Sequence, residues 1–145
     1  MFLGEYEYKV DNKGRLPLPP KFRQELVNGL VLTRGTEKCI VAYPKTEFEK
    51  MSGTLAPATI IENEQRRMLK RAIFSNAEEA NVDGQGRIAL PSRLKDYAQI
   101  KDAAIVAGTN NYIELWNPDI WNSVRVEAEQ KVHQIIEKES LEGQQ

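Results

Sequence analysis

The stretch VDNKGRLPLPPKFR at residues 10–23 returns 72 residues later as VDGQGRIALPSRLK at residues 82–95. Six of the 14 aligned positions are identical, far more than chance matching gives. Each copy contains Asp-x-x-Gly-Arg, in which an Asp side chain typically accepts backbone N–H bonds and the glycine adopts a positive φ. We therefore expect two copies of one rigid turn, built by Asp11, Gly14, Asp83 and Gly86.

The repeat extends beyond this motif. With one residue inserted, residues 32–36 lie over residues 105–109. Further along, Ile40, Tyr43 and Phe48 lie over Ile113, Trp116 and Trp121. A unit of about 45 residues buries too little apolar surface to be stable alone. The two copies are therefore expected to pack on each other, or each to pair with another chain.

Both copies predict the same order of elements: strand, turn, short strand, short helix and two further strands. Pro17 has no backbone N–H, so an edge position or an interrupted ladder is expected for its strand. Together these elements indicate an α+β fold. In the first copy we expect strands at 5–10, 15–18, 30–33 and 39–43 and a helix at 20–26, and in the second a helix from about 92 and strands at 103–107 and 112–116.

Two further helices are expected outside the copies, at 57–71 and 118–138. The second carries an apolar stripe at three-four spacing, which indicates packing on the chain's own sheet or, as an alternative, a seam between subunits. The stripe comprises Trp121, Val124, Ala128, Val132 and Ile135. The expected organisation is domain 1 at 5–47, a helical linker at 48–75, domain 2 at 76–119, and a C-terminal helix and tail at 120–145.

Composition narrows the class of protein. The chain has 145 residues, of which 41% are hydrophobic and 28% charged, so a disordered or collagen-like chain is not expected. The single cysteine, Cys39, excludes an intramolecular disulfide and any Cys-based zinc site. No apolar run reaches the ~18–20 residues of a membrane span, and residues 1–10 lack the apolar core of a signal peptide. We therefore expect a cytoplasmic protein without a membrane partner.

Charge is distributed unevenly along the chain. The net charge of −1 speaks against a nucleic-acid partner, because phosphate binders tend to be basic. However, residues 9–23 carry a net +4 and residues 82–95 a net +2, whereas residues 114–145 carry −4. Basic side chains that recur at equivalent positions beside a rigid turn can meet phosphates or guanine edges.

Catalysis has little support in the sequence. The only histidine, His133, lies in a charged helical segment without a nucleophile motif nearby, and no metal-ligand spacing is present. The duplicated Asp11 and Asp83 could form an acid–base dyad, as in aspartic proteases. Each is followed four residues later by an arginine, which would keep the carboxylate ionised, whereas a dyad shares one proton. We therefore expect a binding protein that needs no cofactor, no metal and no small-molecule substrate.

The duplicated motif resembles that of a known family. The Asp-x-x-Gly-Arg turn, the following Leu-x-Leu-Pro and the Phe-Arg pair resemble the AbrB/SpoVT swapped-hairpin DNA-binding domain. Two tandem copies in a chain of this length, opening with Met-Phe-Leu-Gly-Glu-Tyr, are similar to the bacterial MraZ transcriptional regulators. The resemblance covers essentially the whole chain.

The resemblance implies both a fold and a function. The two units would form one pseudo-symmetric swapped-hairpin β-barrel, and subunits would assemble into a ring. The ring would bind short repeated boxes of double-stranded DNA upstream of the division and cell-wall gene cluster, repress its transcription and associate with the nucleoid. The alternative within the same fold is an AbrB-like antitoxin or other partner-binding module, with one DNA-binding copy and a disordered toxin-binding tail.

The resemblance also implies which side chains contact DNA. The motif arginines are Arg15 and Arg87, with Lys13 in the first turn. Gln85 replaces Lys13 in the second copy, so the two turns are not expected to contribute equally. The remaining basic residues of the repeated stretches 10–23 and 82–95 complete the expected DNA-binding set: Lys21, Arg23, Arg93 and Lys95.

Overall fold

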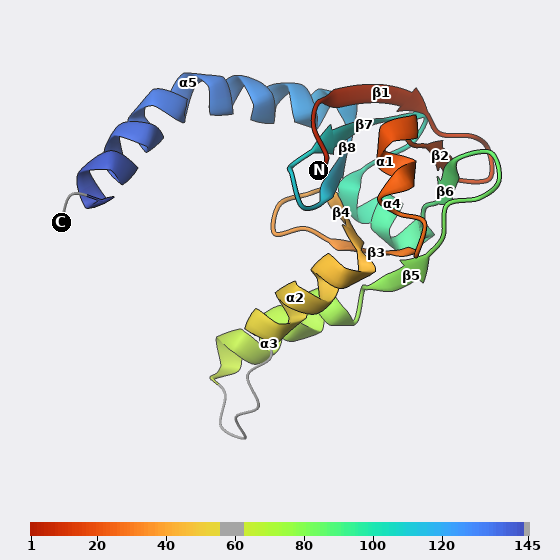
Figure 1. Ribbon diagram of the computed structural model, residues 1–145, viewed down its shortest axis with the longest axis horizontal. Helices are drawn as coiled ribbons and strands as arrows, with labels where there is room; N and C mark the ends of the chain where they lie inside the picture. The colour runs from red at the N-terminus through yellow and green to blue at the C-terminus, as the bar shows by residue number, and fades with distance from the viewer. Residues whose placement is uncertain (56–62, 144–145) are drawn as a thin grey trace.

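The computed structural model describes residues 1–55 and 63–143, which form an α+β fold with antiparallel strands (Figure 1). Each copy of the repeat contributes four strands and a short helix, close to the expected positions. The elements are β1 (Glu5–Lys9), β2 (Arg15–Pro17), α1 (Pro20–Gln24), β3 (Leu30–Arg34), β4 (Ile40–Pro44), α2 (Lys45–Leu55), α3 (Glu64–Phe74), β5 (Glu78–Ala80), β6 (Arg87–Ala89), α4 (Ser92–Ala98), β7 (Ala103–Gly108), β8 (Ile113–Trp116) and α5 (Pro118–Gly143).

The strands of the two copies are interleaved. A six-stranded sheet has the order β1-β7-β8-β4-β3-β5, and β2 pairs with β6 in a separate two-stranded sheet. Each outer strand of one copy pairs with a strand of the other, since β1 pairs with β7 and β5 with β3. Two pairings join equivalent strands of the two copies. In the pair β2–β6, Leu16 lies opposite Ile88, and in the pair β4–β8, at the centre of the large sheet, Val41 lies opposite Glu114. The two copies therefore pack on each other within one chain.

The expected closed barrel is not observed. In the part of the chain that the structure describes, the large sheet ends at β1 and β5, and no hydrogen-bonded ladder joins it to β2–β6. The strands β2 and β6 are only three residues long, and Pro17 has no N–H to donate to a further strand. The expectation that Pro17 lies at a sheet edge is confirmed, because β2 pairs with β6 alone.

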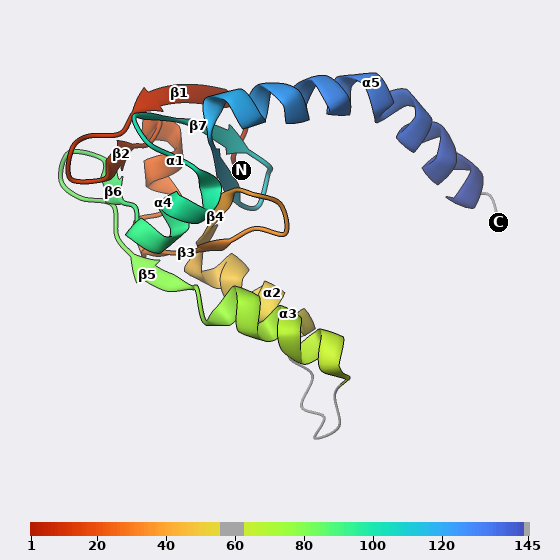
Figure 2. The same cartoon turned by 180° about the vertical axis from the view of Figure 1, so that it is seen from behind.

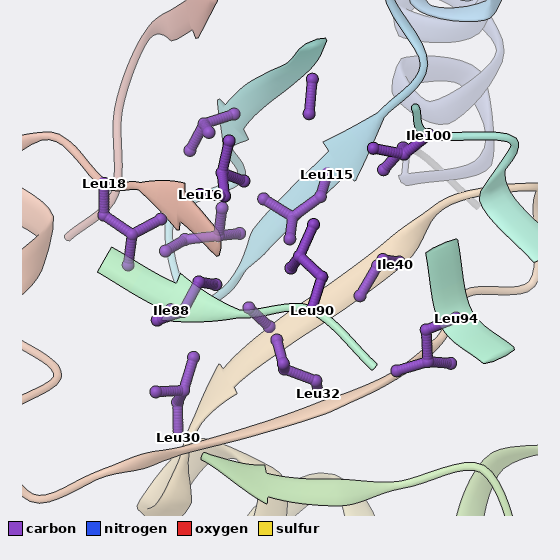
Figure 3. Close-up of a cluster of buried hydrophobic side chains, with 14 of the residues drawn as sticks. Leu16, Leu18, Leu30, Leu32, Ile40, Ile88, Leu90, Leu94, Ile100 and Leu115 are labelled. Atoms are coloured by element: carbon purple, nitrogen blue, oxygen red, sulfur yellow. The ribbon is translucent and has the colours of Figure 1, made fainter. Parts of the chain in front are cut away.

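The main hydrophobic core lies between the large sheet and a layer made of β2, β6, α1 and α4. Equivalent residues of the two copies meet there at Leu16 and Ile88, as Figure 3 shows, and Leu18 and Leu90 lie at the two opposite ends of the β2–β6 pair. Both Leu16 and Ile88 are fully buried. The large sheet contributes Leu30, Leu32, Ile40 and Leu115 from the opposite side, and Leu94 and Ile100 close the end of the core (Figure 3).

The register of the large sheet corrects one detail of the repeat. Leu32 pairs with Ala42, and Val106 pairs with Leu115, so Leu32 is equivalent to Val106 rather than to Ile105. The expected alignment of residues 32–36 with residues 105–109 is therefore wrong by one residue. Two residues are added before β7, where α4 has seven residues and α1 five, and one residue is removed between β7 and β8. Leu32 and Val106 then share the core face, as the two-residue period of a strand requires.

Helix α5 packs on the chain's own sheet only at its start. Ile120, Trp121 and Val124 cover a smaller cluster around Trp116 on the other face of the sheet. From there the helix projects away from the body (Figures 1 and 2). Packing on the own sheet is therefore wrong for the distal stripe, because Val132 and Ile135 are 41% and 52% exposed. The helix also continues past residue 138, to Gly143.

The described part of the linker contains two helices, α2 and α3, of which only one was expected. Of the expected helix at 57–71, residues 64–71 are confirmed, because α3 begins at Glu64, where the Asn63 side chain accepts a hydrogen bond from the backbone N–H of Arg66 at 2.8 Å. Residues 57–62 of the expected helix lie outside the described residues. The unexpected helix, α2, follows β4 directly. It lies beside α3, with the Phe48 and Phe74 rings 5.9 Å apart.

Candidate nucleic-acid interface

Asp11 organises the first turn (residues 11–15) through local hydrogen bonds of its side chain and its backbone. Its Oδ1 accepts from the backbone N–H groups of Lys13 and Arg15, both at 2.9 Å. Its Oδ2 accepts from Nε of the Arg15 side chain at 3.0 Å. Its backbone N–H donates to the Arg15 carbonyl at 3.0 Å, and Gly14 has a φ of 75°. The arginine is thereby fixed to the turn that presents it.

The second turn (residues 83–87) has the same geometry. Asp83 Oδ1 accepts from the backbone N–H groups of Gln85 and Arg87 at 2.9 Å, and Oδ2 accepts from Arg87 Nε at 3.1 Å. The backbone N–H of Asp83 donates to the Arg87 carbonyl at 2.8 Å, and Gly86 has a φ of 79°. The two motifs therefore form one structural unit twice.

The β2–β6 ladder holds the two turns at the same end of the molecule (Figure 1). It continues into the turns, because Leu18 N–H donates to the Gly86 carbonyl at 3.0 Å and Leu90 N–H donates to the Gly14 carbonyl at 2.9 Å. Each turn therefore accepts a backbone hydrogen bond from the segment that follows the strand of the other copy. Their separation is set by backbone hydrogen bonds, as a rigid two-part recognition surface requires.

Ion pairs link the charged side chains of the two turns. Arg87 bridges both carboxylates, with Nε 3.1 Å from Asp83 and Nη1 3.5 Å from Asp11. The backbone N–H of Arg15 is the main cause that lowers the pKa of Asp11, aided by the Lys13 N–H and the Arg15 guanidinium. The backbone N–H of Arg87 likewise lowers the pKa of Asp83. Both carboxylates are therefore ionised near neutral pH, which disfavours a dyad that shares one proton.

The seven expected DNA-contacting residues are not equally placed. Lys13 is exposed in the first turn, whereas the Arg15 and Arg87 side chains are 32% and 23% exposed. Within the described residues, the only acceptor recorded for the Arg15 guanidinium is Asp11, which takes Nε. The structure brings these three residues together at the end of the molecule formed by the turns.

The other four residues lie on or beside the short helices α1 and α4. Lys21 is exposed on α1, and the Arg93 Nη2 donates to Asn76 Oδ1 at 2.9 Å. Arg23 and Lys95 are half-buried, each next to the glycine of the other copy's turn. These contacts between copies, and that of Arg87 with Asp11, were not predicted from the sequence. The equivalence of Arg23 and Lys95 in the repeat was the available signal.

Several other expected features can be located. His133 lies exposed on α5, remote in sequence from both turns. Among residues 1–55 and 63–143, no group of three His, Cys, Asp or Glu side chains is arranged to hold a metal ion. None of the helices in these two ranges combines the length and the apolar character that crossing a membrane requires.

The whole chain has close relatives of known name. It is 49% identical to the "Transcriptional regulator MraZ" of Dehalococcoides mccartyi (strain ATCC BAA-2266 / KCTC 15142 / 195) over 144 residues, which is 99% of each chain. Proteins of the same name from Roseiflexus sp. (strain RS-1) and Saccharopolyspora erythraea are 42% and 39% identical, over 86% of each chain and over 95% and 96%.

The duplicated unit itself also matches a family. The model of the MraZ protein family, whose description includes "antitoxin-like", matches residues 1–71 and again residues 73–141. Each match contains one Asp-x-x-Gly-Arg turn with its flanking strands and helices. With both copies matched and relatives aligned from end to end, this chain belongs to the MraZ family.

Proposed function

We propose that this protein is a DNA-binding transcriptional regulator that reads double-stranded DNA with its two turns. The observation that carries the proposal is the pair of Asp-x-x-Gly-Arg turns held side by side by the β2–β6 ladder. The name of the relatives, "Transcriptional regulator MraZ", supports the same function. The two DNA-binding units are residues 5–47 and 76–119.

In this mechanism the aspartates orient the arginines. Asp11 and Asp83 engage the Nε of Arg15 and Arg87, which restricts each guanidinium to one direction. The terminal nitrogens of Arg15 are then available for guanine O6 and N7 or for phosphate oxygens. Lys13 adds a phosphate contact in the first turn, and Lys21 and Arg93 flank the surface as further cations.

Avidity then adds to the few contacts that one chain makes. We propose that copies of the chain assemble into a ring, which binds repeated promoter boxes upstream of the division and cell-wall gene cluster and represses it. The apolar residues exposed on α5, among them Ile135, Ile136 and Leu141, support contact with a second copy. Several boxes bound by one ring hold it more tightly than one box. The protein would act in the cytoplasm, associated with the nucleoid.

The two rival functions have less support. An antitoxin with a single DNA-binding copy does not account for the second turn, which matches the first in every local hydrogen bond. An aspartic hydrolase requires a shared proton, whereas Arg87 bridges Asp11 and Asp83 and both carboxylates have a lowered pKa.

A binding titration tests the proposal. DNA carrying one, two or three repeated boxes is titrated at several salt concentrations with the wild type, Arg15→Ala, Arg87→Ala and Lys50→Ala. Lys50 is the matched control, because it is an exposed cation on α2 that forms a local ion pair with Glu47. We expect the arginine variants to lose affinity, and each lost phosphate contact to reduce the salt slope by about 0.9. Wild-type affinity in both arginine variants would refute the proposal.

A further inference from the structure

We propose that Arg23 is a positioning residue that holds the second turn in place for Arg87, rather than a residue that contacts DNA. The inference rests on the proposed DNA-binding function and assigns a separate task to a side chain of the other copy. It starts from the place of Arg23, at the C-terminal end of α1 and half-buried against the second turn.

The Arg23 guanidinium lies where a side chain at position 86 would be. A Cβ atom built on Gly86 would be 2.1 Å from Cζ of Arg23 and 2.3 Å from its Nε. Gly86 is buried, and it has a φ of 79°, which a residue with a side chain rarely adopts. The planar group therefore covers Gly86, which like Gly84 has no side chain of its own.

A hydrogen bond to the backbone holds the guanidinium in this place. Its Nε donates to the Leu18 carbonyl at 2.8 Å. The backbone N–H of Leu18 donates in turn to the Gly86 carbonyl at 3.0 Å. Arg23, Leu18 and Gly86 thus form a continuous bridge from α1 of the first copy to the turn of the second copy.

The bridge ends next to the arginine that is proposed to read DNA. Gly86 immediately precedes Arg87, whose Nε lies 3.1 Å from Asp83 and whose Nη1 lies 3.5 Å from Asp11. A shift of the Gly86 backbone would move Arg87 relative to both carboxylates. Recognition of a base edge by two parallel hydrogen bonds depends on the direction of the guanidinium, so such a shift would weaken binding.

The first turn lacks an equal brace. The equivalent residue is Lys95, and its Nζ approaches a Cβ built on Gly14 only to 3.5 Å, an ordinary van der Waals distance. An ammonium group is a point charge on a flexible stem and has no planar face to cover a glycine. The first turn instead carries the additional cation Lys13, which the second turn replaces with Gln85. Loss of Arg23 should therefore affect the second turn selectively.

The test is a double-mutant cycle on DNA affinity, measured by fluorescence anisotropy with two-box DNA at one salt concentration. Arg23→Ala is made in the wild type and in the Arg15→Ala and Arg87→Ala backgrounds. We expect Arg23→Ala to weaken binding on the order of tenfold in the wild type and in the Arg15→Ala background. In the Arg87→Ala background the same change should alter affinity by less than about twofold.

A conservative variant separates positioning from direct contact. Arg23→Lys keeps the positive charge but removes the planar group and its Nε donor. A positioning role predicts that this variant binds as weakly as Arg23→Ala, whereas a phosphate contact would be kept. Circular dichroism and size-exclusion chromatography check the fold and assembly of every variant. If Arg23→Ala does not fold, Arg23→Lys replaces it in the cycle.

Each outcome of the cycle has one meaning. A full effect of Arg23→Ala in the Arg87→Ala background, or wild-type affinity of Arg23→Lys, would overturn the positioning role and leave the proposed function intact. Wild-type affinity of Arg23→Ala would also overturn the positioning role of Arg23. Wild-type affinity of both Arg15→Ala and Arg87→Ala would instead overturn the proposed function.

Discussion

The two turn glycines provide a stability test with an internal control. Gly14 and Gly86 are equivalent in the repeat, and their φ values are 75° and 79°. An alanine at either position adopts a left-handed conformation at a cost of roughly 1–2 kcal/mol. What differs is the space for the new methyl group. At position 14 its nearest neighbours are 3.5 Å away, and at position 86 it would lie 2.1 Å from Cζ of Arg23.

The difference between the two sites gives the expected magnitude. The end of Arg23 is flexible and can swing away from the new methyl group, but it then loses the hydrogen bond from Nε to the Leu18 carbonyl. Hydrogen bonds to charged groups contribute about 1.5–3 kcal/mol. We therefore expect Gly14→Ala to lower the free energy of unfolding by roughly 1–2 kcal/mol and Gly86→Ala by about 1.5–3 kcal/mol more.

Urea unfolding monitored by tryptophan fluorescence measures both values. All variants are compared at one protein concentration, because assembly makes stability concentration-dependent. The double variant Arg23→Ala/Gly86→Ala is the control. Once Arg23 is gone, the Gly86 change should cost only as much as Gly14→Ala. Equal losses for the two single glycine variants, or an undiminished loss when Arg23 is absent, would refute the reasoning.

Three further predictions follow from burial and charge. The folded state lowers the pKa of Asp11 and Asp83 below the usual 3.8, so their ionised forms stabilise the fold above that pH. This contribution is lost as the pH falls from about 4 through the lowered pKa. Acid unfolding curves should therefore be flatter in this range for Asp11→Asn/Asp83→Asn, and an unchanged slope would contradict the assignment. Burial, together with the charges of Glu114 and Glu37, raises the pKa of the Cys39 thiol to about 12. A thiol reagent at pH 8 should therefore react with the unfolded but not with the native protein. Rapid labelling of the native chain would count against the burial of Cys39. Ile88→Ala should destabilise by about 2–5 kcal/mol, because the side chain is fully buried, whereas the exposed Met68→Ala should change stability by less than about 0.5 kcal/mol in urea unfolding.

Features encoded by neighbouring residues were predictable from the sequence. The strands and short helices of both copies lie close to their expected positions because apolar spacing, prolines and glycines specify them locally. Helix α2 could also have been predicted from the repeat. Phe48 aligns with Trp121 in the repeat, and α2 starts at Lys45, which is equivalent to Pro118 at the start of α5.

Features that depend on contacts between the copies were not predictable. The one-residue shift of Leu32 relative to Ile105 follows from the register of the sheet, which no local pattern specifies. The contact of Arg87 with Asp11 depends on how β2 docks on β6. The stripe on α5 gives the same pattern whether the chain's own sheet or another chain covers it, so exposure of Val132 and Ile135 required the structure.

The pairing of Val41 with Glu114 at the centre of the large sheet bears on how such a chain evolves. These positions are equivalent in the repeat, and two identical chains related by a two-fold axis would place the same residue at both. Two glutamates directly opposite would repel each other. Fusion of the copies allows one position to stay apolar while the other acquires a half-buried carboxylate, which accepts a hydrogen bond from Trp116 Nε1 at 3.2 Å. Duplication within one gene thereby frees the symmetric positions to diverge, and the unlike pairs Lys13/Gln85 and Arg23/Lys95 record the same freedom at the turns.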